Sequence, residues 1–177
     1  VLPSTFVLYA SHRYGWDARQ VGLMLALVGV CSILMQALVV RPFVARFGER
    51  AALLTAIAGA IAGYALYGLA ATGPALLASV PVFALAFMFM PAMQGLMSSK
   101  VDSTRQGELQ GANGSIMGIT GVIGPTLFAQ TFALFIGSHG GPKVPGAAFF
   151  LASAMMAVAA VLAWRATATA KATGPAA

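Results

Sequence analysis

Hydrophobic residues form long runs in this chain, and the polar residues gather between them. Residues 20–40, 51–99 and 111–142 contain no Asp, Glu, Lys or Arg. A helix of about 20 predominantly apolar residues crosses a bilayer, and it satisfies every backbone amide where lipid offers no partner. The pattern predicts full spanning helices at residues 21–40, 51–72, 74–98, 111–136 and 145–164.

The first ten residues are also apolar, but they are too few to cross a hydrocarbon core of about 30 Å. They also lack the basic segment that opens a signal peptide. We therefore expect the end of a further spanning helix, cut short, and a chain that is the carboxy-terminal part of a longer protein. The expected fold class is an all-α membrane protein. We expect a six-helix transmembrane bundle over 1–164, with a truncated first helix, and a disordered cytoplasmic tail over 165–177.

Composition supports a membrane protein. Of the 177 residues, 59% are hydrophobic and 8% are charged, with a mean hydropathy of +0.87. Soluble domains are about 45–50% apolar and about 25% charged, so a soluble globular domain is excluded. The one cysteine, Cys31, lies within an apolar run, which excludes a disulfide framework and a paired-cysteine metal site.

The net charge of +6 is explained by membrane topology better than by a nucleic-acid partner. Segments rich in Lys and Arg stay on the cytoplasmic side of a membrane. The predicted spans place seven basic residues on one side: Arg41, Arg46, Arg50, Lys100, Arg105, Arg165 and Lys171. Only Arg13, Arg19 and Lys143 fall on the other side. The first side, with the C-terminus, is predicted to be cytoplasmic.

No acidic or basic residue lies within the predicted spans. An ionisable group inside a membrane is the usual candidate for ion coupling, so these residues offer no evident proton relay. The sequence also lacks paired carboxylates, a metal-ligand cluster and an activated nucleophile. We predict no enzymatic activity, no metal and no cofactor.

Uncharged amides and flexible apolar side chains are the candidates for ligand contact. A buried amide must find a hydrogen-bond partner, so Gln36 and Gln94 are expected to face other helices or a wet cavity. Bonding between helices and contact with a substrate both remain open. Phe87 and Met90 belong to a run of Phe and Met residues that can repack around apolar ligands, or pack against neighbouring helices.

Small residues and prolines indicate how the helices meet. Gly59 and Gly63 lie four residues apart, as do Gly114 and Gly118. Such spacing lets helix backbones approach closely, either as a fixed packing seam or as a moving interface. Pro91 and Pro125 each remove a helix hydrogen bond and favour a kink.

Three stretches carry a resemblance to a known family. They are residues 14–17 (YGWD) with 21–23, residues 45–50 (ARFGER), and residues 90–94 (MPAMQ) continuing through 101–111 to Gly124 and Pro125. Together they resemble the carboxy-terminal half of a major facilitator superfamily transporter, most closely the drug:proton antiporters related to tetracycline exporters. The resemblance covers nearly the whole chain.

The resemblance implies roles for individual residues. Substrate-binding residues on a central cavity wall would be Ser32, Gln36, Phe87, Met90, Gln94 and Asn113. Conformational residues would be Pro91, Gly118, Gly124 and Pro125. A cytoplasmic loop motif would use Arg46, Gly48, Arg50, Asp102 and Arg105.

The implied function is proton-coupled efflux of amphipathic drugs or metabolites by alternating access, in the bacterial inner membrane. Such transporters consist of two related halves, so the partners are the lipid bilayer, a missing amino-terminal six-helix half, a small-molecule substrate and protons. The fragment alone should be inactive. Tetracycline exporters can carry a His and an acidic residue where this chain has Ser32 and Ala60, so the substrate need not be tetracycline. The alternative is a non-transporting membrane scaffold or assembly subunit.

Overall fold

The computed structural model describes residues 2–136 and 146–172, which form helices and no strands. The all-α fold class is therefore confirmed. The elements are α1 (Leu2–Tyr14), α2 (Ala18–Leu34), the π-helical segment η1 (Met35–Val40), α3 (Arg41–Leu69), α4 (Gly73–Ala84), the 3-10 segment η2 (Leu85–Met88), α5 (Phe89–Ser98), the 3-10 segment η3 (Ser103–Arg105), α6 (Gln106–Ile136) and α7 (Ala147–Ala172).

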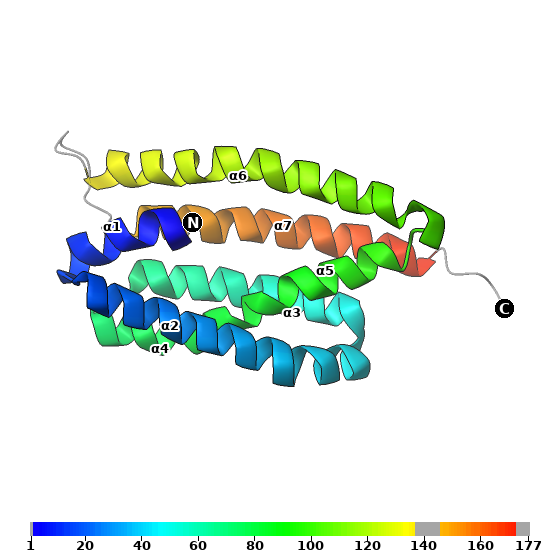
Figure 1. Ribbon diagram of the computed structural model, residues 1–177, viewed down its shortest axis with the longest axis horizontal. Helices are drawn as coiled ribbons and strands as arrows, with labels where there is room; N and C mark the ends of the chain where they lie inside the picture. Colours follow the sequence, from blue (N-terminus) through cyan, green and yellow to red (C-terminus); the bar gives the residue numbers. More distant parts are fainter. Residues whose placement is uncertain (1, 137–145, 173–177) are drawn as a thin grey trace.

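Four helical stretches of the described residues are long and apolar enough to cross a membrane. They are Ala18–Leu69, Gly73–Ser98, Ser103–Phe135 and Ala147–Ala168. The first contains 52 residues, which as one straight helix would measure about 78 Å, more than twice the hydrocarbon thickness. It breaks at Gly48, whose backbone has φ 80° and ψ 165°. Figure 1 shows the chain turning back there, so that this stretch holds two of the predicted spans.

The predicted connection at residues 41–50 is helical except at Gly48, where the chain turns. Pro42 lies in the first turn of α3, where a proline is tolerated, and residues 43–47 contain no helix breaker. The charged residues indicate where the helix leaves the apolar region. They do not end it. In the same way, α6 begins at Gln106 and not at residue 111.

The predicted disordered tail is also corrected in part, since α7 continues from Trp164 through Ala172. Alanine is the strongest helix former, and this segment is rich in it. The hydroxyl of Thr167 donates to the Ala163 carbonyl at 2.7 Å, and the Nε of Arg50 donates to the Thr167 oxygen at 3.0 Å. These contacts tie the extra turns to α3. The remainder of the predicted tail, 173–177, and the predicted outer loop with Lys143 lie outside the described residues.

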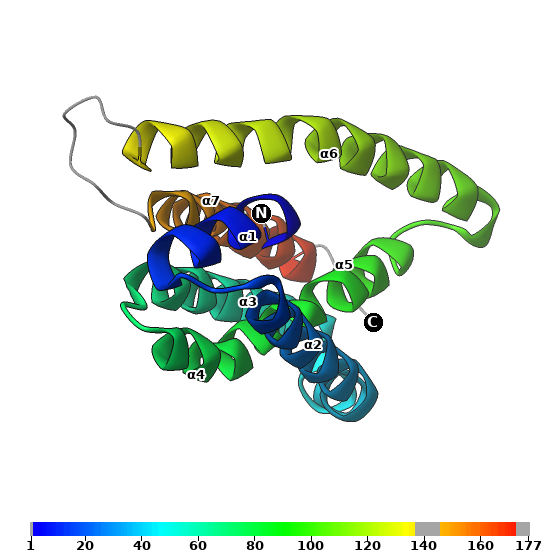
Figure 2. The same ribbon diagram turned by 60° about the vertical axis from the view of Figure 1, so that its left-hand side comes forward.

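Helix α3 lies at the centre of the arrangement, in contact with α4, η2, α5 and α7 (Figure 2). Its two glycines make the close approach that their spacing predicts. A Cβ atom on Gly63 would lie 2.8 Å from the backbone of Phe83, and one on Gly59 would collide with the side chain of Leu85. On another side, the Ser153 hydroxyl of α7 donates to the Ile61 carbonyl at 2.9 Å.

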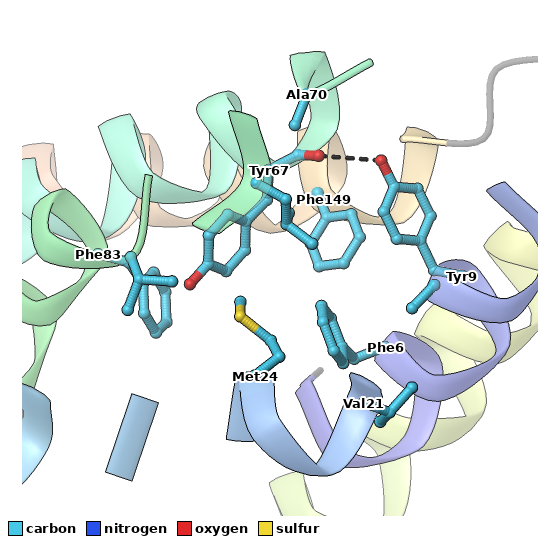
Figure 3. Close-up of a cluster of buried hydrophobic side chains, with 11 residues drawn as sticks. Phe6, Tyr9, Val21, Met24, Tyr67, Ala70, Phe83 and Phe149 are labelled. Carbon is cyan, nitrogen blue, oxygen red and sulfur yellow. Dashed lines mark hydrogen bonds between the residues drawn. The ribbon is translucent and has the colours of Figure 1, made fainter. Parts of the chain in front are cut away.

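A buried aromatic cluster joins α1, α2, α3, α4 and α7 at one end (Figure 3). It includes Phe6, Tyr9, Met24, Tyr67, Phe83 and Phe149. The last carbonyls of a helix have no partner inside that helix. Here the Tyr9 hydroxyl donates to the Tyr67 carbonyl at 3.0 Å, and the Tyr14 hydroxyl donates to the Ala70 carbonyl at 2.6 Å. Helix α1 therefore caps the end of α3.

Helix α6 lies along the edge of the other helices in both views (Figures 1 and 2). A Cβ atom added at any of the glycines between residues 111 and 124 of α6 would meet nothing within 4 Å. Its large side chains there are exposed, among them Ile116, Ile119 and Val122. Near its far end α6 reaches a buried cluster, in which Phe128 packs with Ala148 and Ala152 of α7.

Candidate functional site

Two pairs of hydrogen-bonded polar side chains include three of the predicted substrate-binding residues, namely Ser32, Gln36 and Gln94. The first lies where α2 passes into η1. There the side-chain amide of Gln36 donates to the Ser32 hydroxyl at 3.0 Å. Ser32 is half-buried and Gln36 is exposed. The π-helical segment that holds Gln36 was not predicted, and such segments are frequent at functional sites.

The second pair joins α5 to α6. The Gln110 amide donates to the side-chain oxygen of Gln94 at 3.1 Å, and one turn further along α6 the Asn113 amide lies 3.8 Å from the sulfur of Met97. Met90 lies four residues before Gln94, on the same face of α5, and is 45% exposed. Gln94 thus forms the hydrogen bond between helices that was one of its two predicted roles. Its partner, Gln110, was not among the predicted site residues.

Phe87 does not join either pair. It packs against the aromatic cluster, with its ring edge-to-face against Phe83 at 5.8 Å between centroids. Within the described residues, no hydrogen bond links the Ser32 pair to the Gln94 pair. The structure therefore presents two separate groups of uncharged hydrogen-bonding side chains on exposed faces of neighbouring helices.

The prolines differ in their effect. The 3-10 segment η2 ends three residues before Pro91, in the turn where the missing proline N–H leaves a carbonyl without its helical donor. The span Gly73–Ser98 therefore changes its helical geometry near the middle. Pro125, by contrast, lies in an unbroken α6 that curves gently (Figure 2). Gly118 and Gly124, the other predicted conformational residues, lie on the open stretch of that helix.

The first part of the predicted loop motif forms a turn held to α7. Gly48 supplies the positive φ that the reversal requires. The Arg46 guanidinium lies over the ring of its neighbour Phe47 at 5.5 Å, whereas the Arg50 guanidinium lies 5.2 Å from the centre of the Trp164 ring. Arg50 thus links the start of the returning α3 arm to the end of α7.

The second part of the motif pairs locally. The Arg105 guanidinium donates to Glu108 at 2.8 and 3.0 Å, three residues along the same helical stretch. Both side chains are about two-thirds exposed. Together with Lys100 and Asp102 they line a polar hollow of about 310 Å³. Arg105 therefore pairs within its own part of the chain.

A close contact between Glu49 and Gly95 was missed from sequence. A Cβ atom on Gly95 would collide with the Glu49 carboxylate. The sequence did offer a signal, because Gly95 is the one glycine of the predicted span at 74–98 and Glu49 is the one acidic residue of the segment 41–50 between two predicted spans. Their proximity depends on how α3 crosses α5, which no local pattern reveals.

No group of three or more His, Cys, Asp or Glu side chains that could hold a metal occurs within residues 2–136 and 146–172. The described chemistry is therefore hydrogen bonding by amides and hydroxyls beside flexible apolar side chains. Such a surface can orient an amphipathic molecule by a few polar contacts.

Comparison with known proteins gives the family. The family model described as Major Facilitator Superfamily matches residues 1–177. The tetracycline resistance protein, class C, of Escherichia coli is 32% identical over 147 residues, which cover 82% of this chain and 37% of that protein. The class H protein of Pasteurella multocida is 33% identical over 75% of this chain and 33% of that protein.

A relative of a different kind is the hippocampus abundant transcript-like protein 1 of Rattus norvegicus. It is 30% identical over 75% of this chain and 26% of that protein. No solved structure matches the chain significantly. The chain spans only about a third of the length of the tetracycline resistance proteins that it matches. The chain belongs to the major facilitator superfamily.

Proposed function

We propose that this chain forms the second half of a proton-coupled efflux antiporter that exports amphipathic drugs or metabolites. The observation that carries the proposal is the family match over residues 1–177, together with about 32% identity to tetracycline resistance proteins. The exposed amides beside Met90 support an amphipathic substrate, because they combine hydrogen-bonding groups with an adaptable apolar side chain.

The proposed mechanism is alternating access, in which this half rocks against an amino-terminal six-helix half around a site near the middle of the bilayer. Gln36 and Gln94 orient the substrate, Ser32 and Asn113 extend the polar wall, and Met90 and Phe87 provide apolar contact. The change of helical geometry before Pro91 and the open glycines of α6 supply flexibility. The proton-carrying residues lie in the other half, since the spans here contain no carboxylate.

The proposed location is the bacterial inner membrane, with the C-terminus in the cytoplasm. The excess of Lys and Arg on one side supports this orientation. A reporter enzyme fused after Ala177 tests it, because alkaline phosphatase is active only in the periplasm. Phosphatase activity of that fusion would contradict the orientation.

Transport is tested with everted membrane vesicles that contain the natural full-length protein. A proton gradient should drive uptake of a cationic amphipathic dye, and an ionophore that collapses the gradient should abolish it. Gln36→Ala and Gln94→Ala should each reduce uptake several-fold, whereas Gln130→Ala, an exposed amide further along α6, serves as the matched control.

Unchanged uptake in both variants would remove the assignment of the site while leaving the transport function in place. Absence of gradient-driven uptake in the wild-type protein, across a panel of amphipathic compounds, would favour the scaffold alternative.

A further inference from the structure

An apolar groove of about 500 Å³ lies between α5 and α7, with α3 as its floor. Its walls are the side chains of Phe89, Met93, Leu96 and Met97 on α5 and, on α7, three alanines with one leucine: Ala159, Leu162, Ala163 and Ala166. No residue of this groove belongs to the proposed substrate site. Figure 1 shows α5 and α7 ending on the same side of the molecule.

The groove has the length of one membrane leaflet. Along α5 its lining residues extend from Phe89 to Met97, about 12 Å at the helical rise, with Lys100 just beyond the end of the helix, and along α7 from Ala159 to Thr167, also about 12 Å. Half of a hydrocarbon core of about 30 Å is about 15 Å. An acyl chain that enters at Lys100 from the interface would therefore extend along the groove to about the bilayer centre.

The open end of the groove is cationic. Lys100 lines it and forms no ion pair within the described part of the chain. Thr167 lines it too, and its hydroxyl oxygen accepts from the Arg50 guanidinium, which brings a second positive charge to within 3.0 Å of a residue of the groove. Trp164, 59% exposed beside Arg50, has the position of an interfacial anchor.

The nearby carboxylates do not enter the groove. No Asp or Glu is among its lining residues. Asp102 and Glu108 line the separate polar hollow beyond Lys100, and Arg105 already pairs with Glu108. The Glu49 carboxylate lies against Gly95, which is two residues from both Met93 and Met97 and so on roughly the opposite face of α5.

We propose that this groove binds one anionic phospholipid of the cytoplasmic leaflet, with an acyl chain between α5 and α7 and its phosphate group at Lys100 and Arg50. Basic pockets between helices on the cytoplasmic side are suited to acidic headgroups, and the apolar walls favour the chain. The bound lipid bridges the end of α5 to the end of α7, two elements that otherwise meet mainly through α3.

Native mass spectrometry of the natural full-length protein tests the proposal. Three probes are added in turn: phosphatidylglycerol, phosphatidylcholine with the same acyl chains, and glycerol phosphate. Phosphatidylglycerol should bind preferentially. Lys100→Gln should lower its affinity about fivefold, which corresponds to about 1 kcal/mol for one basic residue near a membrane surface. Arg41→Gln, which removes an exposed cation outside the groove, should leave the affinity unchanged.

A second pair of variants tests the apolar part. Ala159→Phe fills the groove and should reduce binding of both phospholipids, whereas Ala157→Phe on the exposed side of α7 should not. Should Ala159→Phe fail to fold, Ala166→Leu fills the same groove nearer its mouth. Equal binding of the two phospholipids, unchanged affinity in Lys100→Gln, or binding of glycerol phosphate as tight as that of phosphatidylglycerol would each overturn the proposal.

Discussion

Two helices of this chain carry glycines at the same spacing and use them differently. Gly59 and Gly63 of α3 are buried against Leu85 and Phe83, so closely that no side chain fits. Gly114 and Gly118 of α6 meet no neighbour within 4 Å. In lipid, packing of small residues is a main source of association between helices. The α3 pair is thus part of the packed interior of this chain, whereas the α6 stretch contributes nothing to it.

The largest loss of stability is expected when a large side chain replaces a buried glycine of α3 and, for comparison, an open glycine of α6. Gly63→Leu forces a side chain into the backbone of Phe83, and overpacking of this kind costs about 3 kcal/mol. Gly118→Leu enters open space and replaces a poor helix former, so stability should hold or rise slightly. Thermal unfolding of both variants in detergent measures the difference. Equal losses of stability would show that α6 packs as tightly as α3.

A smaller effect is expected where α1 caps α3. Tyr9→Phe leaves the buried Tyr67 carbonyl without its donor, which costs about 1–3 kcal/mol. The Tyr67 hydroxyl is the matched control, because within the described residues it is buried and has no hydrogen-bond partner. Tyr67→Phe should therefore be neutral or stabilising in the same unfolding measurement. A larger loss in Tyr67→Phe than in Tyr9→Phe would contradict this assignment of the two hydroxyls.

The link between α3 and α7 should contribute about 1 kcal/mol. Arg50→Gln removes a hydrogen bond to Thr167 and the contact with the Trp164 ring. Arg46→Gln, which loses only its contact with the adjacent Phe47, should change little. Trypsin digestion after Lys171 offers a second measurement, since cleavage should accelerate in Arg50→Gln alone. Identical cleavage rates in Arg50→Gln and Arg46→Gln would show that Arg50 does not hold the end of α7 to α3.

The smallest loss of stability is expected at the start of α6, where Arg105 pairs with Glu108. Arg105→Gln breaks an exposed pair with Glu108, and such pairs contribute about 0–1 kcal/mol. The loss should disappear at high salt, because surface charges are screened there. Unfolding at low and high ionic strength measures it. A loss that persists at high salt would show that Arg105 has a further role.

Several features could be predicted because they depend on local physics alone. Long uncharged runs must be helical in lipid, and the predicted span at 74–98 corresponds closely to Gly73–Ser98. The spacing of small residues predicted a close approach at Gly59 and Gly63 and at Gly114 and Gly118 alike, and the first pair shows it. The polar candidates were identified from the cost of burying an amide, and Gln94 indeed has an amide partner.

Other features were missed because they depend on contacts between distant residues. Residues 41–50 separate two predicted spans, and the helical structure on both sides of Gly48 was not predicted. The tail was expected to be disordered, yet Arg50 holds Thr167, 117 residues away in the chain. Phe87 was a candidate either for contact with a ligand or for packing against neighbouring helices, and only the structure shows that it packs with the aromatic cluster.

By itself, the sequence determined that this chain forms membrane-spanning helices, because long uncharged apolar runs must satisfy their backbone hydrogen bonds internally in lipid. Its motifs, and not its hydrophobic pattern, carried the resemblance to the major facilitator superfamily that the family match then showed. Only the tertiary structure decided which glycine pair is buried, which amide meets which, and where a groove remains between α5 and α7. Those outcomes depend on how helices cross one another. Crossing is set by side chains far apart in the chain, so no local pattern contains it.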